Sequence, residues 1–188
     1  ARDAIDGDER FELVDIDHCP PDWAGKVHAA WSGVRRGRGV DGAELLCFTD
    51  ADCAFEPGAL RAASAMLERR GLDLLSLLTR LSHDAWFERL IQPAAVFELM
   101  RQYPINRANR SGERQRPFVN GQFMLFRAEA YRALGGHEAV RDEILEDLAL
   151  GRRCKAQGLR AGVVLAGPMV RCRMYGSFGA FRAGWTRI

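Results

Sequence analysis

The stretch of sequence that decides the fold reads Leu45-Leu46-Cys47-Phe48-Thr49-Asp50-Ala51-Asp52. A short, continuous apolar run of this kind is typical of a strand buried on both faces of a sheet. Two carboxylates follow the run directly. Residues i and i+2 of an extended chain project to the same side, so we expect both carboxylates at one spot beyond the end of this strand.

The end of a buried strand is where open α/β sheets bind ligands. Two hard oxygen ligands there suit Mg²⁺ or Mn²⁺, which proteins hold through one or two carboxylates together with substrate phosphates. A solvated acidic turn is the alternative, because Asp-x-Asp is a short and common pattern. Asp50 and Asp52 are therefore candidate metal ligands.

The segments around this strand alternate between strand and helix patterns. Phe11–Ile16 alternates apolar and polar residues, as a strand does. Residues 25–36 and 58–69 have helical periodicity, and residues 72–78 are a second buried-strand candidate. The order β-α-β-α-β predicts an α/β domain with a largely parallel sheet and right-handed crossovers.

The second half of the chain is less regular. Residues 84–103 form an amphipathic segment interrupted at Pro93, and residues 106–116 are typical of a polar loop. Beyond them we expect a strand, two helices and two strands, in that order, at residues 118–126, 128–134, 143–157, 161–165 and 169–173. Neither an internal repeat nor a low-complexity linker is present, so we interpret residues 1–188 as one domain.

Composition places the chain among globular proteins, with 47% hydrophobic residues, and its net charge of only +2 argues against a nucleic-acid partner. No run reaches the ~18 apolar residues of a membrane span, and the polar start at Ala1-Arg2-Asp3 is not a signal peptide. Five cysteines without a Cys-x-x-Cys pair argue against a disulfide framework or a structural zinc site. We expect reduced thiols in a cytosolic environment.

Two further places along the chain have residues suited to chemistry. Glu146 and Asp147 lie in a predicted helix, where a carboxylate can act as a general base. The alternative is that they are first-turn acids favoured by the helix dipole. Lys26 opens another helix, at a position that can hold an anion, although a lysine covering a tryptophan explains the pattern as well.

Three residues, Asn120, Gly121 and Gln122, interrupt an otherwise apolar strand. Glycine allows another group to approach the backbone closely, and amides suit sugar hydroxyls, but a β-bulge with solvated amides is equally consistent. Arg173 could contact a diphosphate or form a structural ion pair. His137 follows Gly135-Gly136 and is expected at the surface after a helix end.

The order of these motifs along the chain closely resembles the family 2 glycosyltransferases. The motifs are Trp-x-Gly-Lys, Phe-Thr-Asp-Ala-Asp, Asn-Gly-Gln-Phe-Met-Leu-Phe-Arg, Gly-Gly-His, Glu-Asp, Arg-Met-Tyr and Gly-Trp. The resemblance runs from about Phe11 to Trp185. Within the family it is greatest to the bacterial membrane-associated branch that acts on lipids such as hopanoids or carotenoids.

The resemblance implies a GT-A-type, Rossmann-like fold with a mostly parallel mixed sheet flanked by helices. It implies that Asp50 and Asp52 hold the metal and the donor diphosphate, and that Asp147, beside Glu146, is the catalytic base. It assigns to the donor side Lys26, Asn120, Gly121, Gln122 and Arg173. The Gln-x-x-Arg-Trp motif of many members is not present as such, because the stretch reads Phe181-Arg182-Ala183-Gly184-Trp185.

The implied reaction moves a sugar from a nucleoside-diphosphate sugar to an acceptor hydroxyl, lipid-linked in this branch. It is an inverting displacement assisted by Mn²⁺ or Mg²⁺. A metal-dependent nucleotidyltransferase is one rival, although no basic Gly-rich loop for a triphosphate is visible. A non-catalytic interaction module is the other.

The family pattern also predicts what surrounds this domain. It begins with a first nucleotide-binding strand and, in this branch, continues into C-terminal membrane helices. We find neither in the sequence and interpret the chain as a truncated catalytic domain, soluble and inactive by itself. In the full-length protein it would lie at the cytoplasmic face of the inner membrane, with residues 84–103 as a candidate contact for the membrane or a lipid acceptor. A core helix kinked at Pro93 is equally consistent with that segment.

Overall fold

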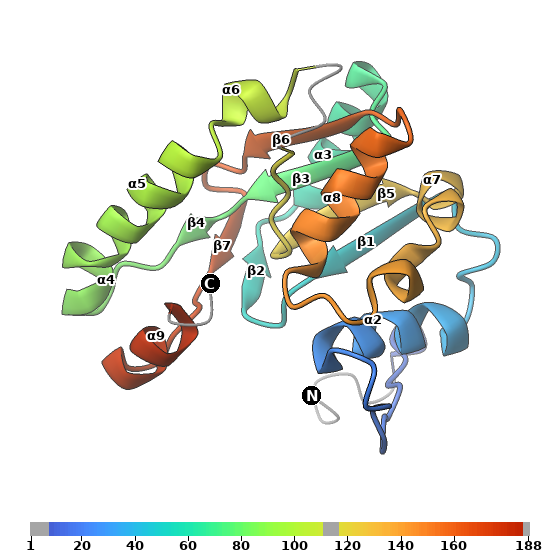
Figure 1. Cartoon of the computed structure of the whole chain (residues 1–188), viewed down its shortest axis with the longest axis horizontal. Helices are drawn as coiled ribbons and strands as arrows, with labels where there is room; N and C mark the ends of the chain where they lie inside the picture. Colours follow the sequence, from blue (N-terminus) through green and yellow to red (C-terminus); the bar gives the residue numbers. More distant parts are fainter. Residues whose placement is uncertain (1–7, 111–116, 186–188) are drawn as a thin grey trace.

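The computed structural model of the chain describes residues 8–110 and 117–185. Four strands form the main sheet in the order β1 (Leu45–Thr49), β5 (Phe123–Arg127), β3 (Leu74–Leu78) and β6 (Ala161–Leu165) (Figure 1). β1, β3 and β6 run in one direction, and β5 runs against them between β1 and β3. The mixed sheet is confirmed, but among the described strands of this main sheet only the β3–β6 ladder is parallel, because β5 separates β1 from β3.

A smaller sheet continues from the edge at which β1 and β3 end. Its order is β2 (Cys53–Phe55), β7 (Val170–Cys172) and β4 (Arg80–Leu81). β2 pairs antiparallel with β7, and β4 pairs parallel with it. The chain passes from β1 to β2 through residues 50–52 and from β3 to β4 through Thr79. The Asp-x-Asp triplet therefore lies where the two sheets meet.

Helices cover both faces of the main sheet, which gives three layers. One face packs against α2 (Gly25–Arg36), α7 (Ala128–Ala133), the 3₁₀ helix η1 (Gly136–Val140) and α8 (Glu146–Ala156), and the other packs against α3 (Ala59–Arg70). Within β3, Leu74 joins the first core and Leu75 the second. Because successive strand residues point to opposite faces, a strand covered on both sides is mostly apolar, as β3 is apart from Ser76.

A group of helices extends away from the two sheets (Figure 1). It consists of α4 (Trp86–Leu90), α5 (Gln92–Gln102) and α9 (Phe178–Trp185), whereas the short helix α6 (Ile105–Ala108) that follows α5 packs against β6. The break between α4 and α5 falls next to Pro93, as predicted. No helix within residues 8–110 and 117–185 is both long enough and apolar enough to cross a membrane.

Some predicted elements differ from the structure. Phe11–Ile16 is not a strand: no strand within residues 8–110 and 117–185 pairs with it, and its apolar side chains, such as Phe11, are largely exposed. β1 is present but is an edge strand in the described part of the chain, with Leu46 buried and Cys47 exposed. An apolar run reports hydrophobicity alone, whereas burial depends on which elements pack beside it.

The middle of the chain also differs in detail. The strand expected over residues 118–126 begins only at Phe123, because residues 117–122 form an irregular segment and a turn. The loop expected over residues 106–116 begins within α6, and its residues 111–116 lie outside the described ranges. The remaining predicted elements are found within a few residues of their expected bounds.

Candidate active site

Four segments meet at the edge of the main sheet where β1 ends. Thr49, the last residue of β1, pairs with Phe123, the first residue of β5, because these two strands are antiparallel. The turn before β5 therefore lies beside the end of β1. Side-chain contacts add the first turns of two helices, α2 and α8, to the same place. Most of the residues predicted to carry chemistry lie in these four segments.

Lys26, in the first turn of α2, connects two of the predicted acids. Its ammonium nitrogen lies 2.9 Å from Asp50 Oδ1 and 2.8 Å from Glu146 Oε1. The Glu146 side chain is only 6% exposed, whereas that of Lys26 is 57% exposed. Burial disfavours the charge of Lys26, but Glu146 and then Asp50 outweigh this effect and raise its pKa. Lys26 therefore stays protonated and compensates the buried charge of Glu146.

Asp147, next to Glu146 in the first turn of α8, is held by two backbone donors. Its Oδ2 accepts a hydrogen bond from the Gly121 N–H at 2.7 Å, and its Oδ1 accepts one from the Leu148 N–H at 2.7 Å. Burial, followed by the charge of Glu146, raises the pKa of Asp147, while the two N–H donors and Lys26 oppose this shift. A raised pKa makes a carboxylate a better proton acceptor near neutral pH.

Gly121 leaves the space in which Lys26 and Asp147 approach the backbone. A Cβ atom at this position would lie 3.1 Å from Asp147 Oδ2 and 3.2 Å from Lys26 Nζ. Any side chain would therefore have to displace one of these groups. The close approach expected from the glycine is present, and the approaching group is the α8 carboxylate.

The amides of Asn120 and Gln122 bind protein rather than solvent. Asn120 Nδ2 donates to the carbonyl of Leu77 at 3.2 Å and to Gln122 Oε1 at 3.0 Å, and the hydroxyl of Thr79 also donates to Gln122 Oε1. The Asn120 N–H donates to Ser76 Oγ at 2.8 Å. These bonds tie the turn before β5 to the end of β3, so both amides shape the site.

Ser76 and Thr79 are functional neighbours that the sequence reasoning missed. Ser76 is fully buried within the apolar run of β3. A hydroxyl inside such a run is itself a signal, because a buried polar group needs a hydrogen-bond partner. Thr79 has no comparable signal, since it lies in a short connection between two strands.

Asp50 and Asp52 point to different surroundings, contrary to the expectation from an extended chain. The Cys53 N–H donates to the Asp50 carbonyl at 3.2 Å, which closes a turn over residues 50–53. Asp50 contacts Lys26. Asp52 is exposed and lies beside Cys53, with Cys53 Sγ 3.8 Å from its Oδ1. The difference arises because the chain changes sheets at this triplet.

The backbone of Arg173 contacts the backbone of Asp52. Its N–H donates to the Asp52 carbonyl at 3.0 Å, and its side chain is exposed. Arg171, two residues earlier, forms an ion pair with Glu56 at 2.7 Å, as a structural role predicts. The backbone of Arg173 thus lies beside that of Asp52. Of the later candidates, Arg182 lies on α9, and the side chain of Trp185 lies outside the described part of the chain.

His137 is not at the surface, contrary to prediction. It is 1% exposed, and its Nδ1 lies 2.7 Å from the hydroxyl of Tyr131. Burial, with a smaller contribution from Lys26, lowers the pKa of His137 to about 4, so the ring is neutral at pH 7. The Gly135-Gly136 pair has positive φ at both residues, which turns the chain inward after α7.

The charge balance of this edge favours a cation. Lys26 faces three acids, Asp50, Glu146 and Asp147, and no lysine or arginine of residues 8–110 and 117–185 forms an ion pair with Asp52. Carboxylate oxygens are the ligands that Mg²⁺ and Mn²⁺ prefer. The residues therefore fit a divalent cation at Asp52, with Asp50 nearby in sequence and held by Lys26.

The chain is similar in sequence to known glycosyltransferases. The chain matches the family described as glycosyltransferase like family 2 over residues 10–175. The 4,4'-diaponeurosporenoate glycosyltransferases of Staphylococcus aureus strains MRSA252 and USA300 are each 29% identical to it over 180 residues. The alignment covers 93% of this chain and 46% of each relative, so the chain spans about half the length of these curated relatives.

A solved structure shares the fold. It is the mannosyltransferase PcManGT from Pyrobaculum calidifontis in complex with GDP-Man and Mn²⁺, with a TM-score of 0.51 and 19% sequence identity. The similarity covers 85% of this chain and 39% of that chain. The mixed sheet flanked by helices is therefore that of a GT-A protein.

Replacing Lys26 tests the electrostatic role assigned to it. In Lys26→Met the buried charge of Glu146 loses its cation, and we expect the free energy of unfolding at pH 7 to fall by about 1–3 kcal/mol. Lys26 also lowers the pKa of Asp147, so its loss raises that pKa further. A carboxyl group whose pKa is raised by folding lowers the free energy of unfolding only at pH values above its pKa in the unfolded state. The difference in unfolding free energy between variant and parent should therefore shrink as the pH falls from 7 towards 4.

The measurement is urea unfolding of both proteins across this pH range. Arg101→Met is the matched control, because Arg101 pairs with Glu98 at 2.6 Å on the exposed surface and should contribute little. A Lys26→Met protein as stable as the parent at pH 7 would contradict the assignment.

Proposed function

The chain belongs to the family 2 glycosyltransferases, and from this premise we propose that it provides the site for sugar transfer from a nucleoside-diphosphate sugar to an acceptor hydroxyl. The observation that carries the proposal is the contact of Asp147 with the Gly121 N–H at 2.7 Å, next to the Lys26–Glu146 ion pair. This contact fixes a carboxylate of raised pKa at the ligand-binding edge of the sheet.

Asp147 acts as the general base in this proposal. It takes the proton from the acceptor hydroxyl as that oxygen attacks the anomeric carbon, and attack opposite the leaving group inverts the configuration there. Glu146 is a positioning residue, because its negative charge raises the pKa of Asp147 and its contact with Lys26 orients the start of α8. Gly121 keeps the space in front of the carboxylate free of a side chain.

Asp52 is the proposed main ligand for Mn²⁺ or Mg²⁺, with Asp50 in support. Asp50 already contacts Lys26, whereas the exposed Asp52 carboxylate lacks a cationic partner in the described ranges. When bound, the ion would neutralise charge on the leaving diphosphate. Arg173 lies beside Asp52 and would contact the same phosphates. The Mn²⁺ and GDP-Man in the mannosyltransferase structure support this choice.

The acceptor is proposed to be a lipid, because an apolar surface lies on the protruding helices. The exposed apolar side chains of these helices are Trp86, Leu90, Phe97 and Phe178, which are 59%, 73%, 72% and 41% exposed. The rings of Trp86 and Phe178 lie 5.2 Å apart, which joins α4 to α9. The carotenoid-type relatives support an apolar acceptor. We propose that this surface, in the full-length protein, lies against the cytoplasmic face of the membrane.

Nucleotide binding tests the metal site. In the intact protein we expect GDP or UDP to bind only with Mn²⁺ present, and we expect Asp52→Ala to weaken that binding by about tenfold or more, because Asp52 would be the main ligand of the ion that neutralises the diphosphate charge. Calorimetry of both nucleotides, with and without Mn²⁺, measures this and identifies the base. Asp41→Ala, in an exposed turn before β1, is the control. Metal-independent binding would count against the site, and no binding would favour a non-catalytic module.

Turnover tests the base. Asp147→Asn should lower kcat by about 100-fold or more while leaving nucleotide affinity within a few-fold, because only proton transfer is lost. Glu143→Gln, an exposed acid just before α8, should leave kcat unchanged. Initial rates of sugar transfer by the intact protein provide the measurement, and a variant within a few-fold of the parent would show that Asp147 is not the base.

Liposome binding tests the apolar surface. The pair for mutation is Trp86 and Phe97, because both side chains are largely exposed. Phe87, the neighbour of Trp86 in the sequence, is 4% exposed and packs against Phe178 and Phe181. The Trp86→Ser, Phe97→Ser double variant should lose most of the binding to anionic vesicles in flotation, because apolar area is what anchors such a surface. Leu60→Ser on α3, 54% exposed, is the control. Binding equal to the parent would remove this surface from the proposal.

A further inference from the structure

Two cysteines far apart in the sequence lie directly opposite each other beside the active site. Cys53 begins β2 and Cys172 ends β7, and they are partners in the antiparallel ladder. The Arg173 N–H donates to the Asp52 carbonyl just beyond the pair. Hydrogen-bonded and non-hydrogen-bonded pairs alternate along an antiparallel ladder, so Cys53 and Cys172 form a non-hydrogen-bonded pair. Side chains of facing strands come closest at such pairs.

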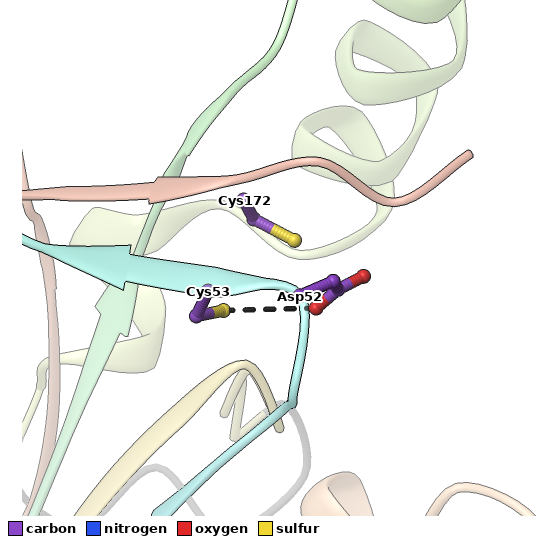
Figure 2. A group of neighbouring side chains, drawn as sticks. All are labelled: Asp52, Cys53 and Cys172. Carbon is purple, nitrogen blue, oxygen red and sulfur yellow. Dashed lines mark hydrogen bonds between the residues drawn. The ribbon is translucent and has the colours of Figure 1, made fainter. Parts of the chain in front are cut away.

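The carboxylate of Asp52 completes a cluster with the two thiols. One carboxylate oxygen and both sulfur atoms lie within 4.8 Å of one another, and Cys53 Sγ lies 3.8 Å from Asp52 Oδ1. Figure 2 shows the Cys172 thiol directed towards the Asp52 side chain. Sulfur at about 2.3 Å and oxygen at about 2.1 Å from a tetrahedral ion are roughly 3.6 Å apart. The cluster therefore has nearly the spacing of a metal site.

We propose that Asp52, Cys53 and Cys172 form a binding site for a thiophilic divalent cation of the Zn²⁺ class. Two thiolates and one carboxylate leave the fourth tetrahedral position open to water or a ligand. Soft sulfur ligands select Zn²⁺ over the harder Mg²⁺ and Mn²⁺. On binding, each thiol releases its proton to the solvent, so the ion replaces two protons.

Burial gives the site one open side. Cys172 is 1% exposed and Cys53 is partly buried, whereas Asp52 is exposed. An ion can therefore enter past the carboxylate and reach sulfur atoms that are otherwise shielded. The donor set differs from the all-oxygen site proposed for Mn²⁺, and the two share only Asp52. Spacing along the sequence gave no indication of this cluster, because its cysteines meet only through the β2–β7 register.

Cobalt is the probe, because thiolate ligands give bound Co²⁺ an intense near-ultraviolet charge-transfer band. The full chain, kept reduced with a phosphine, should bind about one equivalent of Co²⁺ and show this band. Zn²⁺ should displace the Co²⁺, with a dissociation constant at least about tenfold lower. Cys53→Ser and Cys172→Ser should each remove about half of the band, and the double variant all of it, because the intensity follows the number of thiolates. Asp52→Asn should keep the band but weaken Co²⁺ binding by about tenfold.

The exposed cysteines provide matched controls. Cys19→Ser and Cys47→Ser remove thiols outside the cluster and should leave the band unchanged. The proposal is overturned if the folded parent shows no such band, if the band survives in the Cys53/Cys172 double variant, or if it falls in either control. Circular dichroism establishes folding, and Cys53→Ser, at a half-buried position, decides the case if the buried Cys172→Ser does not fold.

These measurements need neither nucleotide nor acceptor, so failure of the transferase proposal would leave the metal proposal standing. One additional measurement tests the metal proposal together with the transferase proposal, and it rests on the proposed function. Because both ions would use Asp52, Zn²⁺ should weaken Mn²⁺-dependent nucleotide binding in the parent and have less effect after Cys53→Ser. An equal effect in both proteins would overturn the sharing of Asp52.

Discussion

The ammonium group of Lys26 lies between two carboxylates that are almost a hundred residues apart, 2.9 Å from Asp50 and 2.8 Å from Glu146. This contact joins the start of α2, the end of β1 and the start of α8 in a single electrostatic unit. It offsets the charge of the buried Glu146, and burial followed by that charge raises the pKa of Asp147. The proposed base therefore depends on a cation that does not take part in proton transfer.

The direction of β5 determines what this unit can reach. Because β5 runs against its neighbours, its first residue pairs with the last residue of β1, and the turn containing Gly121 lies at the edge of the sheet where β1 ends. Asn120 and Gln122 hold that turn against the end of β3. The same edge divides the Asp-x-Asp triplet, since the chain changes sheets there. Asp50 is left with Lys26, and Asp52 with the cysteines of the smaller sheet.

Much of the secondary structure could be predicted from local pattern. The helix Gly25–Arg36 has the expected bounds, because an amphipathic period with glycine beyond its end is a local property. The strand expected at Phe11–Ile16 is absent, since alternation favours a strand but supplies no partner for its hydrogen bonds. β1 was expected to be buried on both faces, but among the strands that the structure describes it lies at the edge of its sheet. The order of strands across a sheet is decided by long-range packing, which a window of sequence does not contain.

For the site, the sequence by itself determined which residue types were available and the family to which their order belongs. It identified Lys26, Gly121 and Asp147 as candidates, and the structure brings these three into contact. Only the tertiary structure decided that Lys26 joins the acids and that Cys53 faces Cys172. Such contacts join residues about 25 to 120 positions apart, and strand register and helix packing set them, whereas periodicity reports only on neighbours within a few residues.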